Sequence, residues 1–182
     1  MALITTAQVK AHAPIVDSGD DAVIDIIVAG VNTWVPSWLN RNLEDAAYVD
    51  HFDGVGGQAL MLPNEPVTSV AYVKVDGVSI PVATTPVALG YRLHGRRLTL
   101  DGYRFTSGLG NVEVSYQAGY TVVPSDIVLA SLELAVQIYR DRERIGLTAK
   151  AINGETTSFF NGVMPARITN MLQPYRSMIP VA

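Results

Sequence analysis

The chain has 182 residues, a formal net charge of −4 and no cysteine, so it is long enough for one domain, or one domain with an elaborate insertion, and disulfides, thiolate metal sites and cysteine nucleophiles are excluded. Apolar residues make up 48% of the chain and charged residues 16%, against roughly 25% charged residues in typical soluble domains. This balance argues against intrinsic disorder and favours apolar surface that partners cover, and the acidic charge argues against a basic patch for nucleic acid.

Residues 1–46 carry two helical patterns, of which the first is short. Thr5 or Thr6 caps a helix that runs toward His12, because threonine hydroxyls accept hydrogen bonds from the first free amides of a helix. Pro14 ends this helix, since the residue before a proline avoids the helical conformation. The opening residues also lack the charged stretch of a signal peptide, so no secretion signal is expected.

The second pattern is longer and opens at Ser18, the expected N-cap, with Asp20 and Asp21 at the positive end of the helix dipole. Pro36 must kink or restart this helix, because proline removes a backbone donor. The longest apolar run, Ile26–Val31, is far too short to span a bilayer, so we expect a soluble chain made in the cytoplasm, without membrane contact. The spacing predicts one buried face, in which both tryptophans pack into the core: Ile24, Ile27, Val31, Trp34 and Trp38.

Residues 47–120 change to the two-residue alternation of β-strands. One alternating run ends at Val75, and a new run begins at Val78. The intervening Asp76-Gly77 is a strong hairpin signal, because both positions of such a turn favour positive φ. Further alternating runs follow, so we expect several short strands in an antiparallel sheet.

Residues 121–145 return to a helical pattern. Pro124 suits the first helical position and Asp126 the first turn, and Gly146 ends the helix. The spacing of the apolar residues predicts a buried face formed by Ile127, Ala130, Leu134 and Ile138.

Residues 146–182 combine a polar, glycine-containing stretch with a short last helix. The stretch up to Gly162 is expected to be a flexible loop, in which no helical or strand period explains Phe159 and Phe160. Two adjacent aromatic residues in such a loop are candidates for an anchor on another surface, or for a contact with the chain's own body. The last helix ends at Pro174, and its apolar face holds Ile168, Met171 and Leu172.

Asp50, His51 and Asp53 form the only local cluster of carboxylates with a histidine. Strand alternation places His51 and Asp53 on one face, which is compatible with a metal ion or a general base, but the polar face of an edge strand is the favoured interpretation because metal sites recruit further ligands from elsewhere. Residues 54–57 resemble part of a phosphate loop, yet strand patterns on both sides favour a β-turn. We therefore expect no catalytic site, no cofactor and no bound metal.

Four arginines gather in the β zone. They are candidates for contact with phosphate, with an acidic partner or with a neighbouring subunit. The alternative is the solvated face of a hairpin, where basic residues protect a sheet edge. The four are Arg92, Arg96, Arg97 and Arg104.

The order of these features resembles the head–tail connector family of tailed bacteriophages, also called neck adaptor or head completion proteins. The resemblance covers nearly the whole chain, beginning with the short helix and the aspartate-capped helix near the N-terminus. Its most specific parts are Tyr-x-Ala-Gly-Tyr-x-x-x-Pro at residues 116–124 and Leu-x-Pro-Tyr-Arg at residues 172–176.

The resemblance implies an α+β fold, in which a small helical bundle carries an antiparallel β insertion between the second and third helices as one connector domain of residues 1–182. It also implies a structural protein without catalysis, which forms a ring, usually a dodecamer, attaches to the portal protein and extends the DNA channel without specific DNA binding. The ring then docks the next neck or tail protein. Such a chain is expected in the virion neck, at the head–tail interface, after assembly in the host cytoplasm.

The C-terminal segment is the expected portal-docking element. A flexible stretch that carries this much apolar surface needs a cover, and segments that become ordered on binding can wrap a partner. The segment also ends on a tyrosine–arginine pair similar to the family's ending, and both residue types are favoured at interface hot spots. The residues expected to dock on the portal are Phe159, Phe160, Met171, Leu172, Tyr175 and Arg176.

Two other functions stay open from the sequence. One is a small metal-dependent hydrolase that uses Asp50, His51 and Asp53, which the metal content of the purified protein would reveal. The other is a tail-tube or baseplate component, which would share the habit of forming rings but contact other partners. The position of the protein in a virion would distinguish it from a neck protein.

Overall fold

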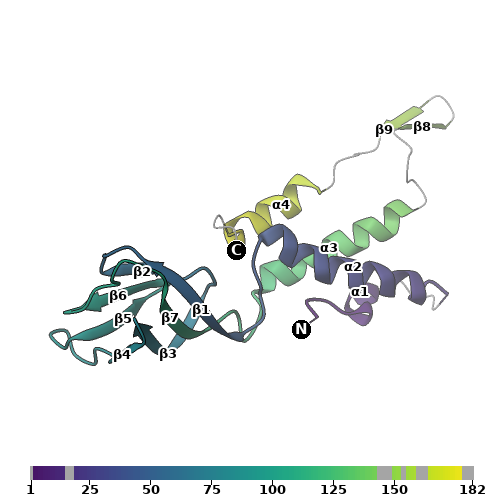
Figure 1. Cartoon of the computed structure of the whole chain (residues 1–182). Helices are drawn as coiled ribbons and strands as arrows, with labels where there is room; N and C mark the ends of the chain where they lie inside the picture. The colour runs from purple at the N-terminus through teal and green to yellow at the C-terminus, as the bar shows by residue number, and fades with distance from the viewer. Residues whose placement is uncertain (1, 15–18, 143–148, 153–154, 159–163, 178–182) are drawn as a thin grey trace. The chain divides into compact units, whose positions relative to one another are not determined.

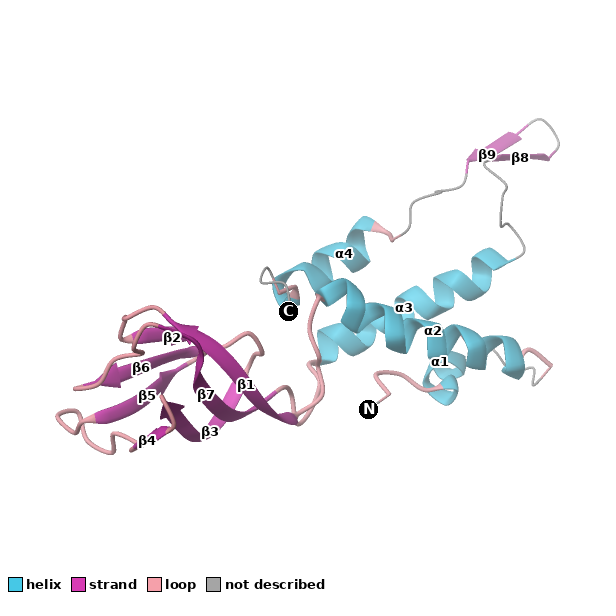
Figure 2. Cartoon of the chain, viewed as in Figure 1, coloured by secondary structure: helices cyan, strands magenta, loops and turns pink. Residues whose placement is uncertain are grey.

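The computed structural model (Figure 1) describes residues 2–14, 19–142, 149–152, 155–158 and 164–177. It contains both helices and antiparallel strands, which confirms the predicted α+β class (Figure 2). The chain divides into two compact units: a helical unit of residues 1–40 and 123–178, and a β unit built on residues 41–122. Along the sequence, the strands of the β unit stand between the second and third helices.

The first helix, α1 (Thr6–His12), begins as the threonine pattern predicts. Its N-cap is Thr5, whose hydroxyl accepts a hydrogen bond from the Gln8 amide at 3.3 Å, while Gln8 Oε1 accepts one from the Thr5 amide at 2.9 Å. This reciprocal capping box satisfies two amides that have no partner within the helix. Val9 is buried, so the face of α1 that carries it packs against the core of the helical unit.

The second helix, α2 (Asp21–Leu39), begins later than predicted. Its N-cap is Asp20, so the expected cap at Ser18, which lies outside the described residues, is wrong. The Asp20 side chain does not cap the helix either. Its carboxylate instead accepts hydrogen bonds from the Tyr139 hydroxyl and, at 3.0 Å, from Arg142 Nη2, which draws it toward the third helix.

The buried face of α2 is also rotated away from the predicted one. Trp34 and Trp38 are half-buried rather than core residues. A tryptophan at the margin of a core keeps its polar ring nitrogen near solvent, while smaller aliphatic side chains fill the interior. The buried residues of α2 are Ile24, Val28, Val31, Val35 and Leu39, so the predicted Ile27 is also displaced from the core face.

Pro36 does not interrupt α2, which continues to Leu39. The helix ends where Asn40 takes the left-handed conformation, with φ of 53°, and its amide donates to the carbonyls of Pro36 and Ser37. Among the described helices, α2 alone is long and apolar enough to cross a membrane. The core helix of a soluble protein can meet the same criterion of length and composition. Its five buried side chains lie within its own unit.

The third helix, α3 (Ser125–Asp141), confirms most of its predicted face. Ile127, Ala130 and Leu134 are buried, but Ile138 is 43% exposed and is not a core residue. The buried face of the helix continues instead through Ser131, Ala135 and Val136. The predicted helix end at Gly146 lies outside the described residues.

The C-terminal part of the helical unit holds a hairpin and a short helix. Strands β8 (Ala149–Ile152) and β9 (Glu155–Ser158) pair antiparallel, so the prediction of a loop is wrong for these residues. Helix α4 (Ala166–Leu172) follows and ends before Pro174, which lies in the 3₁₀ turn Gln173–Tyr175 that continues from the helix.

The β unit consists of two antiparallel sheets. The four-stranded sheet has the order β1-β7-β3-β4, and the three-stranded sheet has the order β2-β6-β5. Asp76 and Gly77 both have positive φ, 52° and 77°, and join β3 to β4, which confirms the predicted hairpin. The strand bounds are β1 (Ala46–Gly54), β2 (Ala59–Met61), β3 (Val67–Val75), β4 (Val78–Ile80), β5 (Gly90–His94), β6 (Arg97–Asp101) and β7 (Gly108–Ala118).

Apolar residues from both sheets form the core of the β unit. Val73 and Val114 are fully buried on neighbouring strands, and Leu98 and Leu100 are buried on β6. Tyr116 brings a polar hydroxyl into this core. Because strand side chains alternate between faces, this core leaves the opposite face of the four-stranded sheet to polar and charged residues.

Candidate interaction surfaces

Strand β1 separates the three residues of the predicted hydrolase cluster. His51 and Asp53 share the exposed face, as predicted, while Asp50 lies on the opposite face and accepts a hydrogen bond from the Tyr116 hydroxyl at 2.6 Å. Asp53 Oδ1 accepts a hydrogen bond from the Gly110 amide at 2.6 Å. Each carboxylate is thus bound to its own chain in a different place, and the three side chains do not converge on one reacting atom.

No metal site replaces this cluster in the described part of the chain. Within it, no group of three histidine, cysteine, aspartate or glutamate side chains is placed to hold a metal ion. The three histidines lie on different elements, His12 on α1, His51 on β1 and His94 on β5. Residues 54–57 begin at Gly54, the last residue of β1, and lead toward β2, which is the strand context predicted for a turn rather than a phosphate loop.

Tyr116 is the centre of a polar network inside the β unit. Its hydroxyl donates to Asp50 and accepts a hydrogen bond from Asn64 Nδ2 at 2.8 Å, and its ring stacks on Tyr48 with centroids 5.5 Å apart. Burial, and then the bond to the Asp50 carboxylate, raise the pKa of Tyr116 far above its ordinary value. The residue therefore acts as a permanent hydrogen-bond donor, which is a structural role.

We expect Tyr116→Phe to destabilise the β unit by about 1–3 kcal/mol, because the change leaves the Asp50 carboxylate and the Asn64 amide without their partner. Chemical denaturation measures this loss. Tyr48→Phe is the control, since the Tyr48 hydroxyl makes an exposed bond with Asn42. Equal stability of the Tyr116→Phe variant and the unmodified chain would contradict the role of this network.

A second polar network lies around Glu113. Its Oε1 accepts hydrogen bonds from the Tyr72 hydroxyl at 2.5 Å and from Lys74 Nζ at 3.0 Å. These two bonds lower the pKa of Glu113, with the Tyr72 bond as the larger cause, and the same contacts raise the pKa values of Tyr72 and Lys74. The network joins β3 to β7 across one face of the sheet.

This network predicts an acid-dependent part of the stability. Because the folded-state pKa of Glu113 is lowered, its contribution is present above the unfolded pKa, about 4.3, and is lost as the pH falls through the lower folded value. We expect Glu113→Gln to be less stable than the unmodified chain at pH 7, and the difference to disappear under acid. Thermal melts at both pH values measure it; a difference that does not depend on pH would exclude the ionic origin.

The four arginines do not form one patch. Arg92 lies on β5 and binds a loop of its own chain: its Nε pairs with Asp101 at 2.6 Å, and its Nη2 donates to three carbonyl oxygens between residues 85 and 88. Arg96 pairs with Glu65 at 3.7 Å, close to the start of β6, whereas Arg104 follows the other end of that strand. Arg97 is exposed at the start of β6. A contact role for these residues stays a prediction.

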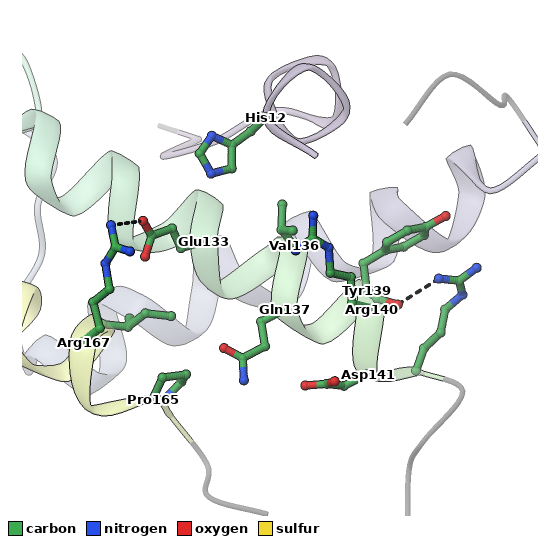
Figure 3. Close-up of a pocket in the computed structure, with 11 residues that line it drawn as sticks. His12, Glu133, Val136, Gln137, Tyr139, Arg140, Asp141, Pro165 and Arg167 are labelled. Atoms are coloured by element: carbon green, nitrogen blue, oxygen red, sulfur yellow. Dashed lines mark hydrogen bonds and ion pairs between the residues drawn. The ribbon is translucent and has the colours of Figure 1, made fainter. Parts of the chain in front are cut away.

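The helical unit contains a pocket of about 660 Å³ between α1, α3 and α4 (Figure 3). Val136 and Ile168 contribute apolar surface, and an ion pair of 2.8 Å between Arg167 and Glu133 joins α4 to α3 at its rim (Figure 3). The remaining lining is mostly polar and mixed in charge: His12, Gln137, Tyr139, Arg140, Asp141, Arg142 and the apolar Pro165. A lining this polar is unlike the predominantly apolar sites that bind small molecules.

The predicted portal-docking residues divide between core and surface. Leu172 is fully buried against the chain's own helices, so the structure corrects the expectation that it contacts a partner. Met171 is half-buried. The Tyr175 hydroxyl lies 3.2 Å from Asp126 Oδ2, and the Arg176 guanidinium lies over the Trp38 ring at 5.0 Å. Phe159 and Phe160 lie outside the described residues.

Sequence reasoning missed two strongly exposed apolar residues at one end of the β unit, Val55 and Leu109. Val55 is 78% exposed and directly follows β1, and Leu109 is 91% exposed and is the second residue of β7, at the end where the two strands meet. The signal was present as two similar triplets, Gly-Val-Gly and Gly-Leu-Gly, in which an apolar residue stands between glycines.

The described residues of the two units carry internally paired charges and exposed apolar side chains, which are features of a contact surface. The chain belongs to the head completion protein family, whose model matches residues 2–178. It is therefore a structural, non-enzymatic protein of the virion, as predicted.

Solved structures with the same fold come from a phage-like particle. One such chain comes from the neck of an empty gene transfer agent particle computed with C6 symmetry. Its sequence is 19% identical to this chain, the TM-score is 0.59, and the match covers 99% of this chain and 92% of that one. The neck of the native particle computed with C12 symmetry is also 19% identical, with a TM-score of 0.57 and coverage of 97% and 90%. No curated protein matches the chain.

Proposed function

We propose that the chain is a neck adaptor that forms a ring on the portal, extends the DNA channel and offers a docking surface to the next neck or tail protein. The observation that carries this proposal is membership of the head completion family over residues 2–178. The fold of the neck chains, matched along nearly its whole length, supports a place in the neck rather than in the tail tube or baseplate.

Charge and symmetry support the same function. A ring of identical subunits is built from heterologous contacts, which need two different surfaces on every copy. The neck structures computed with C12 and C6 symmetry make a dodecamer our proposal for this chain. A net charge of −4 suits a DNA conduit, because many phosphate contacts would retain the DNA that must pass.

We propose that residues 143–163 and the surface of α4 dock on the portal. The hairpin of β8 and β9 supports this proposal, because a two-stranded hairpin alone is at best marginally stable in water and gains from a partner surface. Leu172 is excluded from the proposed contacts because it is fully buried. The residues that we propose to contact the portal are Phe159, Phe160, Met171, Tyr175 and Arg176.

Reconstitution of heads tests the proposed function. DNA-filled heads from a phage that lacks the protein are mixed with the purified chain, separated from free protein and examined for the bound chain and for tail joining. We expect the chain to bind at the portal vertex and to restore joining. Heads that join tails equally well without the chain would overturn the proposal, as would binding spread over the capsid.

The free protein is expected to be a monomer or a small oligomer whose ring is completed on the portal. Each contact in a cyclic ring can be weak alone, because closure joins all of them at once. Native mass spectrometry of the isolated chain measures its assembly state. A closed ring that is stable without the portal would contradict assembly on the portal but not the neck function.

A further inference from the structure

A cluster of three polar side chains joins the start of α2 to the end of α3 in the helical unit. The Asp20 carboxylate accepts hydrogen bonds from the Tyr139 hydroxyl and, at 3.0 Å, from Arg142 Nη2. Arg142 Nη1 also donates to the Tyr139 carbonyl oxygen at 2.8 Å, and its guanidinium lies over the Tyr139 ring, 3.9 Å from the centroid. We call Asp20, Tyr139 and Arg142 the Asp20 clasp. Each of them contacts both of the others, so several interactions determine the geometry together.

The clasp places each charge where a helix dipole favours it. Asp20 is the N-cap of α2, at the positive end of that helix, and Arg142 is the C-cap of α3, at the negative end. An aspartate at an N-cap commonly accepts a hydrogen bond from an amide of its own helix, which stabilises by about 1 kcal/mol. Asp20 makes no such bond. Because its carboxylate binds the end of α3 instead, the residue has a role beyond the start of its own helix.

Side chains, rather than a backbone turn, hold the described end of α3. Arg142 keeps helical dihedral angles, with φ of −55° and ψ of −34°, so the left-handed turn that ends many helices does not occur at this residue. The last carbonyl groups of a helix have no partner within it, and the last turn frays for this reason. Arg142 Nη1 binds one of these carbonyls, that of Tyr139, and Nη2 connects the same turn to Asp20.

The clasp stands where residues 143–163 begin, since Arg142 is the residue directly before them. A second ion pair stands close to where they end: Arg167 on α4 pairs with Glu133 on α3 at 2.8 Å (Figure 3). Ion pairs to α2 and α3 therefore hold the chain on both sides of the segment that we propose to dock on the portal. Contacts that hold a binding element in place before binding reduce the entropy lost when it binds.

We propose that Asp20 is a positioning residue for attachment to the portal: through Tyr139 and Arg142 it fixes the end of α3 from which the docking segment leaves the helical unit. This inference rests on the proposed docking of residues 143–163, and it adds a residue that lies far from them in the sequence. Without the Asp20 carboxylate, the last turn of α3 loses its bonds to α2 and the chain leaves it in more directions. Only a fraction of these directions suits the portal, so attachment weakens while the unit stays folded.

The neighbouring aspartate, Asp21, provides a matched control. Its replacement also removes a negative charge at the start of α2 and also breaks an ion pair, but the partner is Lys10 on α1, at 2.6 Å. We expect Asp20→Ala to speed amide hydrogen exchange in the last turn of α3 at least about tenfold, and Asp21→Ala to leave exchange in that turn unchanged. Exchange is measured on the free chain, so this part of the test does not depend on docking.

Cosedimentation with DNA-filled heads measures the effect on attachment. We expect Asp20→Ala to weaken attachment about tenfold and Asp21→Ala to leave it unchanged, with circular dichroism showing that both variants are folded. Tyr139→Phe is a milder second variant, because it keeps the ring under the Arg142 guanidinium and removes only the hydroxyl bond to Asp20. It should weaken attachment by a smaller factor in the same direction, and it tests the clasp even if Asp20→Ala unfolds.

The outcomes separate this inference from the proposed docking. If Asp20→Ala speeds exchange but attaches as well as the unmodified chain, the clasp only stabilises the helical unit and the inference is wrong. Equal losses of attachment in the Asp20→Ala and Asp21→Ala variants would assign the effect to charge at the start of α2 and would also overturn it. A variant in which a glycine–serine linker replaces residues 143–163 tests docking itself. If that variant attaches to heads, the docking proposal fails, and the inference that rests on it fails too.

Discussion

Replacing residues 143–163 with a glycine–serine linker is expected to abolish attachment of the protein to DNA-filled heads and to leave the helical unit folded. The deletion removes the β8–β9 hairpin together with Phe159 and Phe160, which we propose to contact the portal. It retains α4, whose Ile168 and Leu172 are buried in the helical core. Cosedimentation with heads measures attachment, and circular dichroism measures the fold.

A smaller change isolates the two aromatic residues. The double variant Phe159→Ala/Phe160→Ala should weaken attachment by about 2 kcal/mol or more, because buried aromatic anchors dominate interface energetics. Ile26→Ala on α2 is the matched control, since Ile26 is 74% exposed and lies outside the proposed docking surface. If heads bound the deletion variant as well as the intact chain, residues 143–163 would have no docking role.

Helical periodicity predicted where the helices lie but not which face is buried. In α2, apolar residues occupy two overlapping stripes, one through Trp34 and Trp38 and one through Val35 and Leu39. Both satisfy spacings of three and four residues, so the choice depends on which neighbours pack against the helix. The structure buries the second stripe, a result that tertiary packing decides and that no local pattern contains.

In the β unit, too, features set by neighbouring residues were predictable from the sequence, and features set by distant residues were not. The Asp76-Gly77 turn was predictable because two adjacent residues determine it. In the order β1-β7-β3-β4, by contrast, β7 pairs with β1 and β3, which are far from it in the sequence, and no single segment encodes these pairings. The separation of Asp50 from His51 follows from strand alternation, whereas the partner of Asp50, Tyr116, depends on that distant pairing.

Leu172→Ala is expected to destabilise the helical unit by about 2–5 kcal/mol, because Leu172 is fully buried and its truncation leaves a cavity in a close-packed core. Its neighbour Met171 is half-buried on the same short helix, so Met171→Ala should cost much less stability. Urea denaturation of both variants measures the difference. The pair is informative because the two positions are adjacent and differ mainly in burial.

The same pair separates folding from docking on the head. We expect Met171→Ala to reduce attachment while the fold persists, and Leu172→Ala to reduce attachment only in proportion to the fraction of unfolded protein. A truncation that removes α4 confounds these effects, since it opens the core and removes the proposed contact together. Attachment measured at a temperature where both variants are folded tests the distinction. If the folded Leu172→Ala variant failed to attach, Leu172 would have to contact the portal. In that case α4 would have to separate from the helical core when the chain binds.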